Sequence, residues 1–452
     1  MKTSCGKIEH SSAEIVEILA KSFSENTSTS KLPLQFTSQQ CTGNYNFDTG
    51  MSHETYNAPF TMQELKRAIK HTKNSAPGPD LVHIQMLKNM DYENLTQVLK
   101  LYNNIWKTHC IPNSWKEAIV VPILKPGKTP QEPNNYRPIA LTSVLCKTME
   151  KMVTQRLMNY LEANNKVDPN QSGFRKNHST IDQLIKLQQE ILDGFTQKQY
   201  IVCVFFDFEK AFDRISKKPI MKALQALNLN GNLPLFAEDF LQNRTFKVRL
   251  NGYLSTSHVQ EIGTPQGAVI SPPLFLATLF DIQAQIKKPV CYSLFADDLA
   301  MYIRSSSLAY IEKILQKTIN ELEKWASSKG LQFSPDKTKL INFHRKQNSP
   351  PPINITLYGQ QIQNVTTHKF LGLHFDQQLT WKIHLQHTKK KSTISLNLLK
   401  KISGTKWGAD RKSMLRIYSS HVQSIFDYGA IIYSTASKTD LNKLNSVQNQ
   451  AL

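Results

Sequence analysis

Hydrophobic and polar residues form blocks along this chain, and its clearest apolar blocks end at aspartates. Residues 200–206 (YIVCVFF) are a continuous run rich in β-branched and aromatic side chains, which predicts a strand buried on both faces that stops at Asp207. Residues 291–303 (CYSLFADDLAMYI) predict two short strands that are interrupted by Asp297 and Asp298. We therefore expect a β-hairpin with an acidic turn beside a buried strand.

Helical periodicity is evident on both sides of these strands. Residues 310–330 carry apolar side chains at helical spacing, and a shorter amphipathic pattern covers residues 13–23. Thr61 with Glu64 three residues later predicts a capping box, which we take as the start of a compact domain. From about residue 390 the pattern predicts helices with basic outer faces.

Composition narrows the class of partner. The 452 residues include 55 Lys and Arg against 35 Asp and Glu, a net charge of +20. Such an excess favours a polyanionic partner, nucleic acid before an anionic membrane, with a generally basic soluble surface as the alternative. The 6 cysteines include no Cys-x-x-Cys pair, which predicts reduced thiols in an intracellular protein. No apolar run approaches the roughly 20 residues that cross a bilayer, so we expect no membrane insertion.

The three aspartates suggest a metal site. Carboxylates held together at the ends of apolar strands repel one another unless a cation lies between them. Mg²⁺ prefers oxygen ligands and is usually held by one or two carboxylates plus substrate phosphates. Asp207, Asp297 and Asp298 therefore form a plausible two-metal set for attack of a 3′-hydroxyl on an α-phosphate. Any one of them alone is equally typical of a turn residue or a helix cap.

Several strings then match one family in order: FDFEKAFDR from Phe206, GTPQG from Gly263 and FADD from Phe295. Together they resemble the reverse transcriptases of non-LTR retrotransposons, nearest to the jockey and CR1-like group. The resemblance implies that the three aspartates are catalytic metal ligands and that Phe212 excludes a 2′-hydroxyl. It also implies that Gln266 contacts the incoming nucleotide and Gly267 the template.

Further strings extend the resemblance in both directions. LKPGKTPQEPNNYRPIALTS resembles the fingers motif, which implies that Lys125 and Arg137 face the triphosphate. QSGFR matches a string of the same family, which implies contacts with the template or the nucleotide for Gln171 and Arg175. PDKTKLINF supplies Lys337 where the family has a lysine near the triphosphate.

The family implies an α+β right-hand polymerase whose palm contains an antiparallel split βαβ sheet. Its partners would be an RNA template, a DNA primer and deoxynucleoside triphosphates, with two Mg²⁺ ions and Mn²⁺ as the alternative metal. We also expect a polymerase core taken from a longer element, without its endonuclease and with a truncated thumb. The predicted divisions are an N-terminal linker at 1–60, fingers with an N-terminal extension at 61–200, palm at 201–348, primer-grip region at 349–385 and helical thumb at 386–452.

Other interpretations remain open. A non-catalytic RNA-binding protein could keep this fold, and a nucleotide cyclase could share a palm-like sheet with paired metals. His384 and His387 could share a helix face as zinc ligands require, but no cysteine joins them and the sequence favours solvated or stacked histidines. The lysines at 389–391 are typical of nuclear import or of a helix face that follows a phosphate backbone.

Overall fold

The computed structural model describes residues 11–33, 54–345, 351–404 and 407–451, together with Met1, Glu9, Phe36 and residues 45–47. These residues form two compact units, each assembled from separate stretches of the chain. The first unit contains Met1–Asp168, Phe208–Ala284 and Lys324–Gln332, and the second contains Pro169–Asp207, Gln285–Glu323 and Phe333–Leu452.

The first unit is organised around a mixed sheet with strand order β2-β1-β4-β5, in which β6 also pairs with β4. Its strands are β1 (Glu117–Leu124), β2 (Tyr136–Leu141), β4 (Arg244–Leu250), β5 (Tyr253–Leu254) and β6 (His258–Gln260). β1 and β2 form an antiparallel hairpin, whereas β1 and β4 are parallel with Glu117 opposite Thr245. This sheet positions the β1–β2 hairpin, in which Lys125 follows β1 and Arg137 lies in β2 as the predicted triphosphate contacts.

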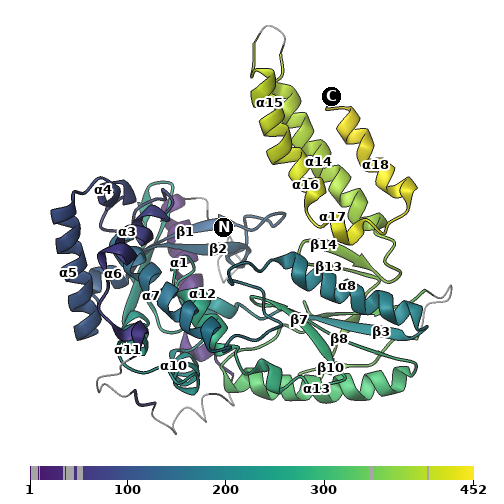
Figure 1. Cartoon of the computed structure of the whole chain (residues 1–452), viewed down its shortest axis with the longest axis horizontal. Helices are drawn as coiled ribbons and strands as arrows, with labels where there is room; N and C mark the ends of the chain where they lie inside the picture. Colours follow the sequence, from purple (N-terminus) through teal and green to yellow (C-terminus); the bar gives the residue numbers. More distant parts are fainter. Residues whose placement is uncertain are drawn as a thin grey trace. The chain divides into compact units, whose positions relative to one another are not determined.

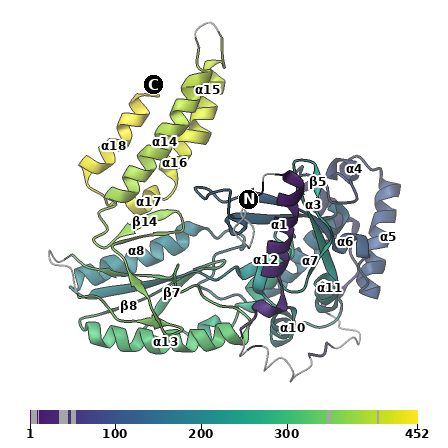
Figure 2. The same cartoon turned by 180° about the vertical axis from the view of Figure 1, so that it is seen from behind.

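Helix α1 (Ser12–Asn26) packs across this sheet, as Figure 2 shows. Its buried side chains, including Leu19 and Phe23, share an apolar core with Val120 of β1 and Val248 of β4. The amphipathic helix that we predicted is therefore present. However, residues 12–26 are an integral part of the first unit, whereas the sequence led us to assign them to a linker, because apolar periodicity alone does not reveal the surface on which a helix packs.

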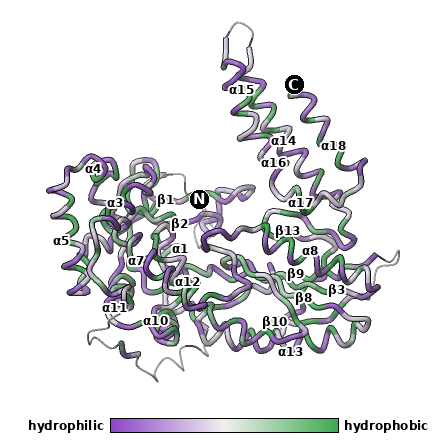
Figure 3. Tube along the Cα trace, in the orientation of Figure 1, coloured by the Kyte–Doolittle hydropathy of each residue, from purple (hydrophilic) through white to green (hydrophobic). Residues whose placement is uncertain are grey.

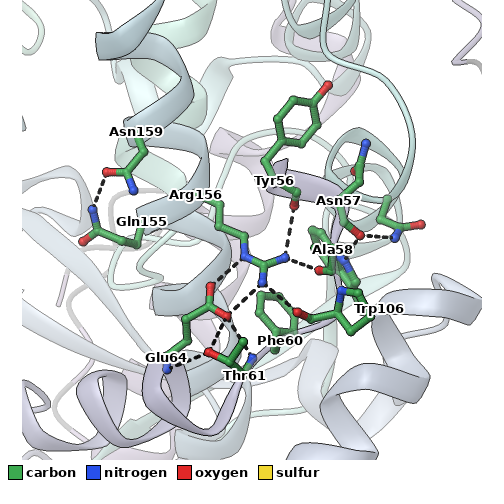
Figure 4. A network of polar contacts seen from close by, with 12 residues as sticks. Tyr56, Asn57, Ala58, Phe60, Thr61, Glu64, Trp106, Gln155, Arg156 and Asn159 are labelled. Atoms are coloured by element: carbon green, nitrogen blue, oxygen red, sulfur yellow. Dashed lines mark hydrogen bonds and ion pairs between the residues drawn. The ribbon is translucent and has the colours of Figure 1, made fainter. Parts of the chain in front are cut away.

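Helices surround the rest of the first unit. They are α3 (Met62–Lys70), α4 (Ile84–Lys88), α5 (Tyr92–Thr108), α6 (Asn113–Lys116), α7 (Val144–Ala163), α9 (Ala211–Arg214), α10 (Lys217–Ala226), α11 (Asn232–Phe240) and α12 (Ser271–Thr278), with 3₁₀ turns at Thr29–Lys31, Thr55–Asn57, Pro133–Asn135 and Ile282–Ala284. The capping box predicted for Thr61 and Glu64 is confirmed at the start of α3. Arg156 of α7 binds Glu64 and nearby backbone carbonyl groups (Figure 4).

The second unit contains a sheet with strand order β12-β9-β3-β8-β7. Its strands are β3 (Tyr200–Phe206), β7 (Cys291–Phe295), β8 (Asp298–Ser305), β9 (Lys339–Phe343) and β12 (Gln363–Asn364). β3 is antiparallel to both β8 and β9. Both the buried strand and the hairpin predicted from sequence are confirmed.

Helices cover both faces of this sheet, because its strands are apolar on both sides. α8 (Thr180–Thr196) lies on one face and α13 (Leu308–Ser328) on the other (Figure 1). Leu187 and Ile191 of α8 pack against Ile201 and Cys203 of β3 in the main core of the unit. The helix predicted near residues 310–330 is thus confirmed as α13.

The remainder of the second unit is two small hairpins and a group of helices. The hairpins are β10 (Thr356–Leu357) with β11 (Gln360–Gln361) and β13 (Thr367–Phe370) with β14 (Leu373–Asp376), and the helices are α14 (Lys382–Ile402), α15 (Arg411–Tyr418), a π-helical turn at Ser419–Gln423, α16 (Ser424–Asp427), α17 (Ala430–Tyr433) and α18 (Lys438–Asn449). Hydrophobic and hydrophilic residues are interspersed along α14 and α18 (Figure 3), as expected for helices with one apolar face. The C-terminal helices predicted from sequence are therefore confirmed.

Within the described residues, no helix is both long enough and apolar enough to cross a membrane. Cys110, Cys146, Cys203 and Cys291 are free thiols. Cys5 and Cys41 lie outside the described residues. So do residues 349 and 350, at the predicted boundary between the palm and the primer-grip region.

Candidate active site at the strand ends

The register of the second unit's sheet brings the three predicted aspartates to one end of neighbouring strands. Asp207 directly follows β3, and the last residue of that strand, Phe206, lies opposite Leu299 of β8. Asp298 begins β8 and pairs with Phe295 of β7, so that Ala296 and Asp297 form a two-residue turn. The apolar strands thus present three carboxylates at a common edge.

The electrostatics of this edge fit a bound cation. Asp298 reaches solvent, yet desolvation by its surroundings, followed by the negative charges of Asp297 and Asp207, raises its pKa to about 6. Lys337 donates a hydrogen bond from Nζ to Asp207 Oδ2 at 2.9 Å and so compensates part of the negative charge. In the described part of the chain, no three His, Cys, Asp or Glu side chains are already arranged to hold a metal ion. A cation that joined the aspartates would therefore have to compete with Lys337 for Asp207.

A buried glutamine supports the acidic turn. Gln171, with only 2% of its surface exposed, donates from Nε2 to the Ala296 carbonyl oxygen at 3.1 Å. Its Oε1 accepts from the Ala296 N–H at 2.8 Å and from the Gly173 N–H at 2.7 Å. Arg175 is half-buried and donates to the Gln171 carbonyl oxygen at 3.0 Å. The side chain predicted to touch template is therefore directed at the protein's own backbone.

The predicted nucleotide contacts Phe212 and Gln266 both belong to the first unit. The ring of Phe212 is half-buried and packs on Phe275 with centroids 4.9 Å apart. Gln266 donates from Nε2 to Asp213 Oδ1 at 2.6 Å, which fixes the orientation of its amide. Sequence analysis missed Asp213, although its position directly after Phe212 in the AFD string would have been a signal.

The neighbouring Gly267 is exposed and has φ of 123°, a conformation that favours glycine. A Cβ atom at Gly267 would lie 2.8 Å from the carbonyl oxygen of Ala140. The Ala140 N–H in turn donates to the Gln266 carbonyl oxygen at 2.7 Å. The backbone at Gly267 thus lies close to β2 of the same unit, whereas the approach to the template that the resemblance implies stays a prediction.

Lys125 and Arg137 lie at the end of the β1–β2 hairpin. Arg137 is exposed and stands opposite Ile123, while Lys125 follows β1 and donates from Nζ to the Asn134 carbonyl oxygen at 2.8 Å. The hairpin therefore leaves Arg137 accessible for an anion, whereas Lys125 would have to exchange its contact with Asn134 first.

The histidines of the predicted primer-grip region are stacked rather than arranged around a metal. His374 lies parallel to His387 with ring centroids 4.3 Å apart, and His368 stacks on Phe205 of β3 at 4.7 Å. Burial, followed by neighbouring positive groups, lowers the pKa values of His368, His374 and His384 to about 4. These rings are accordingly neutral packing elements, in agreement with the stacked alternative.

Apolar strands that carry three carboxylates at one edge define a class of site suited to metal-assisted phosphoryl transfer. The family comparison specifies this class further, since residues 123–375, more than half of the chain, match the sequence profile described as "Reverse transcriptase (RNA-dependent DNA polymerase)". The chain therefore belongs to the reverse transcriptase family.

Curated relatives agree with this assignment. The "Probable RNA-directed DNA polymerase from transposon BS" of Drosophila melanogaster is 29% identical over 404 residues, covering 87% of this chain and 44% of the relative. The "RNA-directed DNA polymerase from mobile element jockey" of the same species is 27% identical over 399 residues, covering 87% and 43%. The chain thus spans less than half the length of these relatives, and the resemblance to the non-LTR group including jockey is confirmed.

Among solved structures, an apo telomerase from Candida tropicalis aligns with a TM-score of 0.43 and 11% identity, covering 79% of this chain and 67% of that chain. This level of similarity is too low to support an argument about the site.

Proposed function

We propose that this chain is the polymerase region of a non-LTR retrotransposon reverse transcriptase, which copies an RNA template into DNA from a primer 3′-hydroxyl. The observation that carries the proposal is the register that gathers Asp207, Asp297 and Asp298 at one end of β3, β7 and β8. The net charge of +20 supports a nucleic-acid partner.

The proposal includes the right-hand organisation of this family. The sheet with the three aspartates would be the core of the palm, with fingers at 61–200, palm at 201–348, primer grip at 349–385 and a helical thumb at 386–452. The two compact units do not follow these bounds, because Pro169–Asp207 belongs to the second unit and Phe208–Ala284 to the first, so the divisions stay a proposal.

In the proposed reaction, the primer 3′-oxygen forms a bond to the α-phosphorus of a deoxynucleoside triphosphate. The bond between the α-phosphorus and the oxygen that bridges it to the β-phosphorus breaks, pyrophosphate leaves and the hydroxyl proton passes to solvent water. Two Mg²⁺ ions, when bound, would lower the pKa of the hydroxyl and neutralise the departing charge. Asp207, Asp297 and Asp298 would hold them, and Mn²⁺ is the alternative ion.

Protein side chains would orient the nucleotide. Arg137 is exposed and can grip phosphate oxygens with two N–H groups, while Lys125 and Lys337 would add positive charge along the triphosphate. The Phe212 ring would exclude a 2′-hydroxyl, and Gln266 would meet the sugar or base through the amide oxygen that its contact with Asp213 leaves available.

Template contacts would come from one residue of each unit. Arg175 and the backbone at Gly267 remain candidates for contact with the RNA. The Gln171 amide is engaged with Ala296, so that its contribution to template binding would be through the protein backbone that it holds.

Primer extension on an RNA template with Mg²⁺ and deoxynucleotides tests the proposal. We expect the Asp297→Ala variant to lose at least about 100-fold in rate, since removing one preorganised electrostatic group from a reacting centre typically costs that much. Asp427→Ala, which removes an exposed aspartate of α16, is the matched control and should retain activity. Absence of extension in the wild type, with salt-sensitive RNA binding intact in every variant, would instead indicate a non-catalytic RNA-binding protein.

A further inference from the structure

The residue before the aspartate pair has an unusual backbone conformation. Ala296 has φ of 57°, in the left-handed region that residues with a Cβ atom rarely adopt. It occupies the first position of the two-residue turn between β7 and β8, where a tight hairpin favours positive φ. Glycine is the usual residue for this conformation, so Ala296 needs support from its surroundings.

Gln171 supplies that support from both sides of the same residue. One carboxamide binds the carbonyl oxygen of Ala296 at 3.1 Å and its N–H at 2.8 Å, so both main-chain polar groups of the turn residue are satisfied by a single side chain. The two groups lie 125 positions further along the chain. Because only 2% of the Gln171 surface is exposed, water does not replace its amide at these contacts.

The glutamine is itself held firmly. Residues 170–172 run parallel to β7, with the Leu294 N–H donating to the Asn170 carbonyl oxygen at 3.0 Å and the Ser172 N–H donating to the Leu294 carbonyl oxygen at 3.0 Å. Gly173 then passes so close that a Cβ atom there would lie 2.2 Å from the Ala296 nitrogen. The segment therefore packs closely against the turn.

We propose that Gln171 is a positioning residue for the active site, whose carboxamide holds Ala296 in the left-handed conformation from which Asp297 and Asp298 project. This inference rests on the proposed function, because it concerns how the carboxylates of Asp297 and Asp298 are oriented for the proposed metal site. Loss of the two hydrogen bonds from Gln171 to Ala296 would let the turn relax toward conformations that an alanine prefers. The carboxylates would then no longer be oriented for metal binding.

Metal binding to the protein alone gives the most direct test. Mn²⁺ binding is measured by titration calorimetry and by the electron paramagnetic resonance of free Mn²⁺, without nucleic acid or nucleotide. Gln171→Met keeps the length of the side chain and removes both polar contacts to Ala296 together with the one to Gly173. We expect it to weaken Mn²⁺ binding by about 10- to 100-fold, the usual effect of removing a group that orients metal ligands.

Gln183→Met is the matched control. Gln183 is also a buried glutamine of the same unit, with 4% exposure, and it donates to Ser172 Oγ at 2.7 Å without a contact to Ala296. We expect Gln183→Met to lower the melting temperature as Gln171→Met does but to bind Mn²⁺ as the wild type does. Equal loss of metal binding in both variants would overturn the proposal, because general damage to packing would explain it.

Gly173→Ala disturbs the same turn while the Gln171 side chain stays in the protein. Its added methyl group must displace Ala296, so we expect a similar loss of Mn²⁺ binding in a protein that keeps the Gln171 amide. Wild-type Mn²⁺ affinity in folded Gln171→Met or Gly173→Ala protein would refute the positioning role while leaving the proposed polymerase activity standing. A wild-type protein that neither binds Mn²⁺ nor extends a primer would overturn both.

Discussion

Arg156 of α7 is predicted to stabilise the first unit by joining this helix to α3 and to residues 56–59. Its guanidinium binds both oxygens of Glu64 at 2.7 and 2.9 Å and donates to the carbonyl oxygens of Tyr56 and Pro59 at 3.1 Å each (Figure 4). It also donates to the Ala58 carbonyl oxygen. The Arg156 side chain is 10% exposed and that of Glu64 is 28% exposed. The planar fork therefore satisfies several main-chain acceptors as well as a partly buried charge.

Replacing Arg156 with alanine leaves the carboxylate and these carbonyl groups without their donor. Breaking a buried ion pair by removing one partner costs about 3–5 kcal/mol, and we expect about 3 kcal/mol here because Glu64 keeps some contact with solvent. The two units are not expected to unfold as one, so the measurement is amide hydrogen exchange resolved by segment. Exchange in α3 and α7 should accelerate by about 100-fold.

The effect should also depend on pH in one direction. Burial raises the pKa of Glu64, but the hydrogen bonds and charge of Arg156, together with hydrogen bonds from Thr61, outweigh it and hold the pKa below its usual value of 4.5. A lowered folded-state pKa contributes stability above pH 4.5 that is lost as the pH falls further. The difference between the wild type and Arg156→Ala should therefore be largest near neutral pH.

Gln155→Ala is the control, because Gln155 lies on the same helix and its exposed side chain donates a hydrogen bond to Asn159 Oδ1 at 2.7 Å (Figure 4). It should change stability by less than about 0.5 kcal/mol. An Arg156→Ala loss below about 1 kcal/mol, or acceleration confined to the second unit, would refute the reasoning.

Three further predictions concern both units. Burial first and neighbouring histidines next lower the pKa of His384 to about 4, so the unfolded chain binds a proton before the folded one and stability should fall as the pH drops from neutral to 5. In pH-dependent unfolding, His384→Gln should remove its own share of this loss, about 2 kcal/mol, while the shares of His368 and His374 remain. Gly78→Ala should destabilise the first unit by at least about 1 kcal/mol in thermal melts, because its Cβ atom would lie 2.6 Å from the Ser143 nitrogen; an unchanged melt contradicts this. Lys337→Met should tighten Mn²⁺ binding by up to about fivefold while raising the KM for nucleotide, because Asp207 loses an exposed competitor; weaker Mn²⁺ binding would contradict it.

Local patterns in the sequence were sufficient to predict several elements. β3 and the β7–β8 hairpin were found because apolar β-branched runs that end at aspartates are local signals. The capping box at Thr61 was also local, since both of its members lie within one helical turn. The structure likewise confirms that the three aspartates gather at one edge.

Features that depend on distant partners could not be predicted. The parallel pairing of β1 with β4 joins Glu117 to Thr245, and no local pattern specifies it. The direction of the Gln171 side chain is a similar case, because its partner Ala296 lies far along the chain and a polar residue in a loop is typical of surface contact. Gly173 was the available signal, since its small size is required beside the turn.

Single-turnover incorporation of one deoxynucleotide, followed as a function of Mg²⁺ concentration on an RNA template with a DNA primer, tests the central claim most directly. We predict incorporation that requires Mg²⁺ and that disappears in Asp207→Asn, while this variant binds the template-primer as tightly as the wild type. Incorporation that persists in Asp207→Asn, or that continues after the metal is removed by a chelator, would contradict the account.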